Sequence, residues 1–168
     1  MGTNACRARA SVKSRLLFVI VAVVWFVLDR VTKVWVVNDL NLYERREVIE
    51  DVFAIHSTRN YGIAFSLFSN AGSLVVIGTL IVGALLFYFM TRVDPSDLIM
   101  VFGGALITAG AIGNLVDRVK DGYVVDFLQF PHFPTFNVAD IGITVGVVFV
   151  LLSQLRDVRR ERSLEPKS

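Results

Sequence analysis

The chain has 168 residues, of which 54% are hydrophobic and only 19% are charged, and its mean hydropathy is +0.60. This composition is too apolar for an ordinary soluble domain, and it excludes a disordered or collagen-like chain. The formal net charge of +2 leaves no basic face for nucleic acid, and the single cysteine, Cys6, excludes an internal disulfide and a cysteine-rich metal site. We therefore expect residues 1–168 to form one integral-membrane domain.

Uncharged stretches of the chain predict four transmembrane helices. A helix that crosses a hydrocarbon core of roughly 30 Å needs about 20 mainly apolar residues. The predicted spans are approximately 16–37, 73–90, 98–116 and 136–155. The first is long enough only if it carries Asp29, Arg30 and Lys33 near its end, and the fourth only if Asp140 enters the membrane edge. A secretory signal peptide is the alternative for the first span, although no small-residue cleavage site follows it.

Lysine and arginine are unevenly distributed among the segments outside the apolar stretches. Segments 1–15, 91–97 and 156–168 hold ten of the 17 lysines and arginines, although segments 29–72 and 117–140 are together nearly twice as long. Positively charged segments stay on the cytoplasmic side. We therefore expect 1–15 and 156–168 to be cytoplasmic tails, so that the far ends of the spans meet at the outer face.

The outer segment 38–72 is the only long stretch in which non-helical structure is expected. Val48, Ile49 and the stretch 52–55 favour strands, and Asn60-Tyr61-Gly62 is a turn signal within an apolar run. We therefore predict a small sheet that rests on the membrane as an outer platform. The fold class is a membrane all-α bundle of four helices with this platform outside the cytoplasm.

Four aspartates stand at predicted span ends on the outer side: Asp29, Asp117, Asp126 and Asp140. A charge at membrane depth costs several kcal/mol unless it is paired or hydrated, which makes each of them a candidate functional residue. The alternative is that they only mark the membrane interface. Asp29 and Lys33 are four positions apart, hence on one helical face, where an ion pair would anchor the first span.

Small residues and polar side chains alternate near the end of the third span. Gly110 and Gly113 allow close helix packing, and the amide of Asn114 is expected to point into the bundle. Asp117 is expected to form an ion pair that fastens this span. Arg118 has more freedom, and its guanidinium could hold a substrate carbonyl or carboxylate.

Asp126 and Asp140 are the best candidates for catalysis. If spans three and four are antiparallel neighbours, both residues lie at one level, and Pro131 and Pro134 help the intervening segment to turn back. Two carboxylates in a poorly hydrated site share one proton. One can then activate water while the other polarises an amide carbonyl, which predicts peptide-bond hydrolysis. The alternative is that the two aspartates cap helix ends independently.

Other function classes have weaker support. There is no Gly-x-Ser-x-Gly motif, and His56 and His132 stand outside any metal-ligand pattern. A small transporter would also carry membrane aspartates, but the charges gather at one face and none lies where it could relay an ion across. A non-catalytic membrane scaffold is the third possibility.

Five short motifs occur in order along residues 16–155. They are Asp29-x-x-x-Lys33, Asn60-x-Gly62-x-Ala64-Phe65, Gly110-x-x-Gly113-Asn114-x-x-Asp117-Arg118, Val125-Asp126-Phe127 and Phe136-Asn137-x-Ala139-Asp140. Together they resemble the signal peptidase II (prolipoprotein signal peptidase) family of bacterial inner-membrane aspartic proteases. Two departures are visible: Arg30 stands where the family frequently has glutamine, and the segment between the last two aspartates is short.

The resemblance implies an aspartic endopeptidase of the bacterial inner membrane that cuts diacylglyceryl-modified prolipoproteins just before the lipid-bearing cysteine. Asp126 and Asp140 would be the catalytic pair. The resemblance assigns substrate binding to Asn60, Gly62, Asn114, Arg118 and Asn137, and a supporting role to Asp29, Lys33 and Asp117. It implies no metal or cofactor, and it implies inhibition by globomycin-like cyclic peptides. The implied fold is a four-helix bundle in membrane lipid with an outer β-cradle and a short amphipathic helix.

Overall fold

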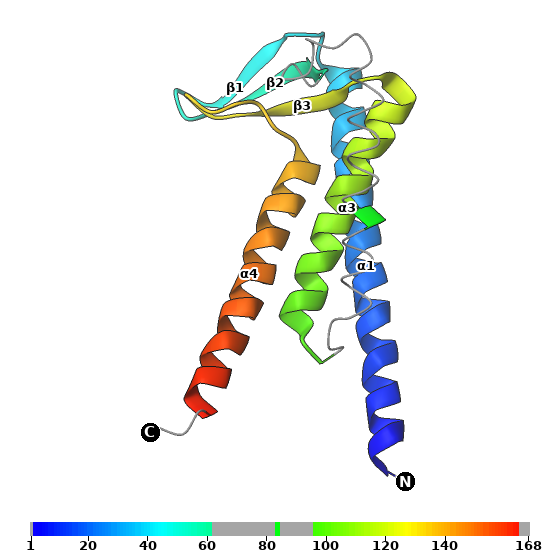
Figure 1. Cartoon of the computed structure of the whole chain (residues 1–168). Coiled ribbons are helices and arrows are strands. Elements are labelled where there is room, and N and C mark those ends of the chain that lie inside the picture. Colours follow the sequence, from blue (N-terminus) through cyan, green and yellow to red (C-terminus); the bar gives the residue numbers. More distant parts are fainter. Residues whose placement is uncertain (1, 62–82, 85–95, 165–168) are drawn as a thin grey trace.

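The computed structural model describes residues 2–61, 83–84 and 96–164. Long helices stand side by side in the described part, and an antiparallel sheet covers one end of them (Figure 1). The elements are α1 (Gly2–Asp39), β1 (Arg45–Ile49), β2 (Phe53–Asn60), α3 (Leu98–Asp121), β3 (Val124–Gln129) and α4 (Val138–Leu164). Contacts of α3 with both α1 and α4 place it between them, whereas α1 and α4 touch much less.

Helix α1 extends well beyond the predicted first span. Its 38 residues correspond to about 57 Å at 1.5 Å per residue, which exceeds the roughly 30 Å of a hydrocarbon core. The helix continues through most of the segment 1–15, which was expected only to be a tail. Val19, Val23, Val27 and Val31 recur every four residues and remain about half exposed, as expected for a face that meets lipid.

Two helices of the described part are long and apolar enough to cross a membrane. They are α3 and residues Val138–Arg160 of α4, which contain most of the predicted spans 98–116 and 136–155. Most of the apolar window of α3 is buried, whereas most of that in α4 is not. The predicted second span, 73–90, lies outside the described residues except for 83–84, so the number of four helices stays a prediction.

Glycines allow the backbones of α3 and α4 to approach closely. A Cβ added to Gly103 would lie 2.8 Å from the carbonyl oxygen of Gly146, and one added to Gly146 would lie 2.6 Å from that of Gly103. Nearer the sheet, a Cβ on Gly110 would collide with the carbonyl of Ala139. The predicted close packing of the third span through small residues is therefore present, and it fixes the level at which α4 begins.

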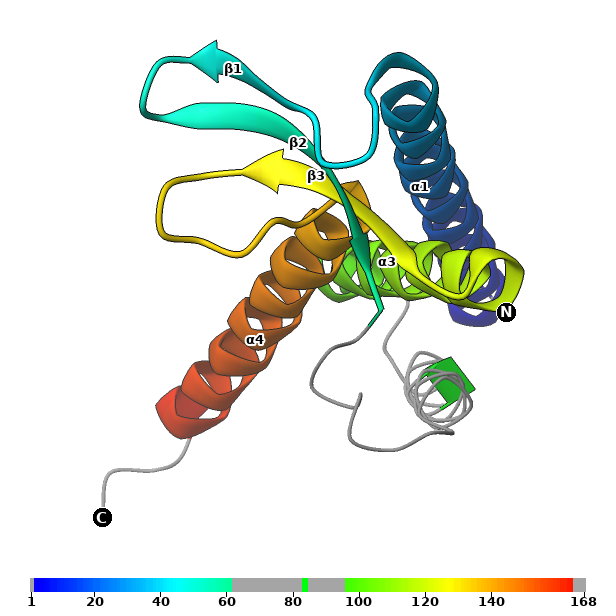
Figure 2. The same ribbon diagram turned by 90° about the horizontal axis from the view of Figure 1, so that it is seen from above.

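The sheet joins two regions that are far apart in the sequence. Its order is β1-β2-β3 with antiparallel pairing, and it extends sideways over the helices when seen from above (Figure 2). The sheet predicted within 38–72 is present as β1 and β2. The remainder of that platform from residue 62 on, where the implied amphipathic helix is expected, lies outside the described residues.

Strand β3 was not predicted, and it corrects the expected position of Asp126. The chain leaves α3 through Gly122, which has a φ of +78°, a conformation that favours glycine. Residues Val124 to Phe127 are then buried in the sheet, with Asp126 opposite Thr58 of β2. Asp126 therefore lies in the middle of a strand and not at the end of a span.

A small apolar cluster connects the sheet to the helices. Val36 of α1, Val125 and Phe127 of β3, and Val138 of α4 are buried against one another. Apolar burial of this kind contributes roughly 25 cal/mol per Å². The cluster fixes β3 between the end of α1 and the start of α4, which is where the candidate site lies.

Candidate active site

Polar side chains are buried together where the helices meet the sheet. The buried members of this group are Asp29, Lys33, Asn114, Asp117, Asp126 and Asn137. Buried polar groups cost free energy unless they are hydrogen-bonded or paired. The contacts among these side chains therefore define the site.

The carboxyl group of Asp126 is held by two amides. The side chain of Asn60 donates to its Oδ2 at 3.0 Å, and that of Asn137 donates to its Oδ1 at 2.7 Å. Asp126 is only 3% exposed. Burial raises the pKa of Asp126 from an ordinary 3.8 to about 6, and the charge of Asp140 adds to this rise. The donors Asn60 and Asn137 oppose the rise because they stabilise the ionised form.

Asp140 lies in the first turn of α4 and is part of its cap. The backbone N–H of Asp140 donates to Oδ1 of Asn137 at 2.9 Å, and the backbone N–H of Asn137 donates to Oδ2 of Asp140 at 3.3 Å. This reciprocal pair is a capping box. The side-chain amide of Asn114 also donates to Oδ1 of Asp140 at 2.7 Å. Asp140 is partly exposed, so one carboxyl of the site can reach a substrate.

Asn137 connects the two candidate catalytic carboxyl groups. Its side-chain amide contacts Asp126 and its backbone N–H contacts Asp140. The same amide donates to the backbone carbonyl oxygen of Val125 at 3.3 Å and to the side-chain Oδ1 of Asn114 at 3.2 Å. The structure thus brings Asp126 and Asp140 to one place. The alternative of two independent helix caps does not describe Asp126, which caps no helix.

A cluster of four charges lies on the α1 side of the carboxyl pair. Nζ of Lys33 is 3.0 Å from Asp29 and 2.8 Å from Asp117, and Nη2 of Arg30 is 2.5 Å from Asp117 and 3.4 Å from Asp29. Two cations and two carboxylates balance each other, as buried charges require. The predicted ion pair of Asp117 is present. Arg30, noted in the sequence only as a departure from the family, is its second partner.

Lys33 also connects this charge cluster to the two candidate catalytic carboxyl groups. Its ammonium group donates to Oδ1 of Asn114 at 3.0 Å. Because an ammonium group can only donate, this contact turns the carbonyl oxygen of Asn114 towards Lys33 and its NH₂ group towards Asp140. Lys33 therefore orients the amide that holds Asp140.

The residues expected to bind substrate differ in how accessible they are. Asn137 is fully buried and Asn114 is 7% exposed, so both position carboxyl groups. Asn60 is exposed and Arg118 is half-buried. The guanidinium of Arg118 lies 3.4 Å from the carbonyl oxygen of Asn114, and no carboxylate of the described residues pairs with it. Asn60 and Arg118 can therefore meet a substrate, whereas Gly62 lies outside the described residues.

Two contacts at the site were not foreseen. The hydroxyl of Thr58 donates to the carbonyl oxygen of Asp126 at 3.0 Å, and the indole N–H of Trp25 donates to that of Val138 at 3.0 Å. Both contacts join residues more than 60 positions apart, and no local spacing indicates them. The pairing of β2 with an unforeseen strand is the only signal that would have pointed to Thr58.

The chain is similar to known proteins over most of its length. The sequence profile described as signal peptidase (SPase) II matches residues 21–156. A lipoprotein signal peptidase of Syntrophus aciditrophicus is 38% identical over 160 residues, which cover 90% of this chain and 99% of that protein. One of Haemophilus influenzae is 35% identical over 159 residues, which cover 90% of this chain and 92% of that protein.

Solved structures agree with this relationship. A bacterial membrane enzyme solved by the in meso method at 2.3 Å resolution has a TM-score of 0.80 and 33% identity, covering 90% of this chain and 94% of its own. A second, solved at 1.9 Å, has a TM-score of 0.80 and 34% identity, covering 84% and 94%. The fold is thus that of a membrane enzyme with helices and a small antiparallel sheet. On the match over residues 21–156 and these identities, the chain belongs to the signal peptidase II family of peptidases.

Proposed function

We propose that the chain is an intramembrane aspartic endopeptidase that removes the signal peptide from diacylglyceryl-modified prolipoproteins, cutting just before the lipidated cysteine. The observation that supports the proposal most directly is that Asn137 forms hydrogen bonds with both Asp126 and Asp140. Relatives that match 90% of the chain are called lipoprotein signal peptidases, which supports this class of substrate.

The environments of the two carboxyl groups suggest different roles. Burial raises the pKa of Asp126 to about 6, which favours Asp126 as the protonated member. Asp140 lies at the positive end of α4, where a helix stabilises negative charge. We assign Asp140 as the base that takes a proton from the attacking water, while Asp126 donates its proton to the carbonyl oxygen. The carbonyl carbon gains the water oxygen, and the C–N bond then breaks as the leaving nitrogen takes up a proton.

The position of the site suits a substrate that is already anchored in lipid. The site lies at the end of the bundle that the sheet covers (Figure 1). Extracting acyl chains costs about 0.8 kcal/mol per CH₂ group, so cleavage at the membrane edge avoids that cost. We propose that this end is at the outer face of the bacterial inner membrane and that both termini are cytoplasmic. Asn60 and Arg118 would contact the peptide there, and globomycin-like cyclic peptides would compete for the same place.

Cleavage of a synthetic lipidated prolipoprotein by the purified protein tests the proposal directly. Asp126→Asn and Asp140→Asn should each abolish cleavage, and mass spectrometry of the product should place the cut before the lipidated cysteine. Asp121→Asn is the matched control, because Asp121 is an exposed acid at the end of α3. Full activity of either catalytic variant, or uptake of a solute by reconstituted vesicles without any cleavage, would refute the proposal.

Labelling of introduced cysteines tests the orientation. Val48 of β1 is 59% exposed, so Val48→Cys in a Cys6→Ser background should react with a membrane-impermeant maleimide in intact spheroplasts. Arg160→Cys near the end of α4 should react only after lysis. The reverse pattern would place the sheet and the catalytic pair on the cytoplasmic side.

A further inference from the structure

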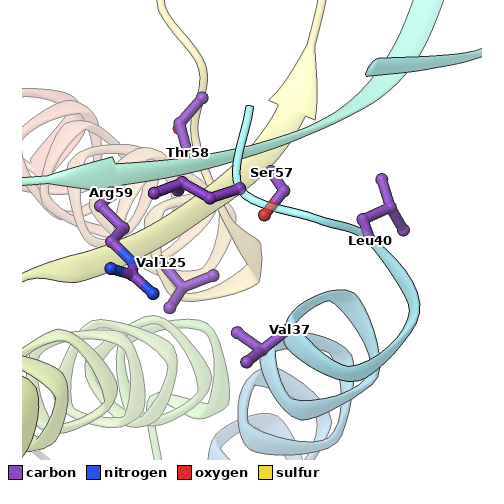
Figure 3. A pocket seen from close by; sticks show the side chains of 7 residues that line it. Val37, Leu40, Ser57, Thr58, Arg59 and Val125 are labelled. Atoms are coloured by element: carbon purple, nitrogen blue, oxygen red, sulfur yellow. The ribbon is translucent and has the colours of Figure 1, made fainter. Parts of the chain in front are cut away.

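A small cavity lies between the end of α1 and the strands β2 and β3 (Figure 3). Its volume is about 50 Å³, and its lining consists of Val37, Leu40, Leu42, Ser57, Thr58, Arg59 and Val125. A water molecule needs roughly 10–15 Å³ of such volume. The cavity therefore has room for about four water-sized groups, which is the size of a phosphate with its four oxygens.

This cavity adjoins the candidate active site but is lined by neither of the two candidate catalytic carboxyl groups. Val125 lines the cavity and Asp126 follows it in β3; successive side chains of a strand point to opposite faces. Val125 is opposite Arg59 of β2, whereas Asp126 is opposite Thr58. Val125 and Arg59 therefore lie on the strand face opposite to the Asp126 carboxyl group, whereas Thr58, which also lines the cavity, bonds to the backbone carbonyl oxygen of Asp126 and lies at the border with the candidate site.

Arg59 is the only charged residue among the described residues that line the cavity. Its guanidinium lies 4.7 Å from the ring centroid of Tyr123, and no carboxylate of the described residues pairs with it. Arg45 and Arg46 on the neighbouring strand differ, because they pair with acids of the same hairpin region. Among the described residues, Arg59 is thus a cation without a paired carboxylate.

Ser57 adds a hydrogen-bond donor to the cavity. It is 5% exposed, its hydroxyl has no hydrogen-bond partner among the described residues, and Figure 3 shows the hydroxyl oxygen on the side of α1. The remaining walls are apolar side chains from the end of α1 and the segment after it. Val34 and Trp35 in the same turns of α1 are 58% and 49% exposed, as expected where a helix end meets lipid headgroups.

We propose that this cavity binds the phosphodiester headgroup of an anionic phospholipid. The guanidinium of Arg59 and the hydroxyl of Ser57 would donate to phosphate oxygens, and charge-assisted bonds of this kind are strong. Val37, Leu40 and Leu42 would contact the glycerol backbone and the first methylene groups. Because no acid lines the cavity, nothing there would pair with a headgroup ammonium. Phosphatidylglycerol therefore fits better than phosphatidylcholine.

Native mass spectrometry of the full-length protein in detergent, titrated with each lipid, tests the proposal. The wild type should bind one phosphatidylglycerol about tenfold more tightly than phosphatidylcholine. Both lipids offer the phosphodiester, but only phosphatidylcholine adds a cationic group, which Arg59 repels. Arg59→Gln should lose this preference, whereas the matched control Arg45→Gln should keep it. A wild-type preference in Arg59→Gln would overturn the proposal.

A second variant tests the cavity without changing its charge. Ser57→Leu fills the space and removes the hydroxyl, so it should also lose the bound phosphatidylglycerol while Arg59 remains. Inorganic phosphate should not displace the lipid at equal concentration, because it lacks contacts with the apolar wall. Equal displacement would show a phosphate site and not a lipid site. Because the readout is binding, its failure leaves the cleavage assay of the proposed function unaffected.

Discussion

The carboxylate of Asp29 accepts a hydrogen bond of 2.9 Å from the backbone N–H of Ala139. Ala139 is in the first turn of α4, where backbone N–H groups have no partner within the helix. Oδ1 of Asn137 accepts a hydrogen bond from the backbone N–H of Asp140. The carboxylate of Asp29, which lies on α1, does the same for the backbone N–H of Ala139. Since Asp140 is the next residue, the contact lets α1 determine the position of one of the two proposed catalytic carboxyl groups.

Replacing Asp29 should therefore affect both the fold and the site. Asp29→Ala removes the cap and leaves Arg30 and Lys33 with one carboxylate between them. Breaking a buried ion pair in this way destabilises a protein by about 3–5 kcal/mol, and cleavage should fall with the displacement of Asp140. Asp29→Asn keeps an oxygen for Ala139 and should retain part of the activity. Thermal unfolding in detergent and the cleavage assay measure both effects; a wild-type melting temperature for Asp29→Ala would contradict the assignment.

Arg30 should matter for stability and much less for catalysis. Its contact with Asp117 is 2.5 Å, but its side chain is 24% exposed, and Lys33 still reaches both carboxylates in its absence. We expect Arg30→Gln to destabilise by about 1 kcal/mol, between the values for surface and buried pairs. The cleavage rate should change little because Arg30 contacts neither Asp126 nor Asp140. Arg30→Lys is the control that keeps the charge. Loss of cleavage in a stable Arg30→Gln protein would place Arg30 in the site itself.

The close approach of α3 and α4 should not tolerate an added methyl group at Gly110. A Cβ there meets the Ala139 backbone and, at 2.8 Å, a side-chain carbon of Ile143. Overpacking costs about 1–3 kcal/mol, and moving α4 separates Asn114 from Asp140. Gly110→Ala should therefore lower both the melting temperature and the cleavage rate. Among the described residues, a Cβ at Gly83 meets nothing within 4 Å, so Gly83→Ala is the control and should match the wild type.

The helical part of the fold could be predicted because its signals are local. Charge-free stretches located α3 and α4, and the glycines near Asn114 indicated the close packing that the structure shows. The ion pair of Asp117 followed from the cost of a lone charge in lipid. Each of these inferences needs only neighbouring residues and the properties of the membrane.

The sheet and the accessibility of the site depend on contacts between distant residues. Strand β3 has six residues and an aspartate at its centre, so its sequence alone does not distinguish it from a loop. Only its pairing with β2, more than 60 positions away, makes it a strand. The burial of Asn137 likewise depends on packing from three elements. The sequence therefore drew attention to Asn137 but did not indicate that it is fully buried with its amide on Asp126, and its assignment to substrate binding stays a prediction.

The stability of the protein should depend on pH through Asp126. Its pKa is raised from 3.8 to about 6, so the folded state holds the proton more tightly than the unfolded state. The contribution of Asp126 to the free energy of unfolding is therefore fully present below pH 4 and is lost as the pH rises through 6. The increase in its pKa corresponds to a contribution of about 3 kcal/mol. Asp126→Asn cannot ionise and should be more stable than the wild type at pH 8, with the advantage disappearing near pH 4. Melting curves across this pH range measure the difference in stability. The control variant Asp121→Asn, at an exposed position, should show no such difference. If Asp126→Asn were more stable than the wild type by the same amount at every pH, the ionisation of Asp126 could not be the cause.

The pH dependence of cleavage should shift when Asn60 is replaced. The amide of Asn60 donates to Oδ2 of Asp126 at 3.0 Å and lowers the pKa of that carboxyl by stabilising its ionised form. In the proposed mechanism, cleavage requires one proton on the pair of carboxyl groups, so the alkaline limb of kcat/KM reports the upper apparent pKa of the two together. Asn60→Ala removes a donor to the ionised form, and the alkaline limb should therefore move to higher pH.

The profile of kcat/KM against pH can distinguish a contact of Asn60 with substrate from its contact with Asp126. Loss of a substrate contact lowers kcat/KM equally at every pH, whereas loss of the Asp126 contact moves the limb. Asn41→Ala is the matched control, because Asn41 is an exposed amide that bonds to Glu44 and not to the catalytic pair. An unchanged limb in Asn60→Ala would mean that Asn60 acts only on substrate, and a shift to lower pH would mean that the proton resides elsewhere than on Asp126.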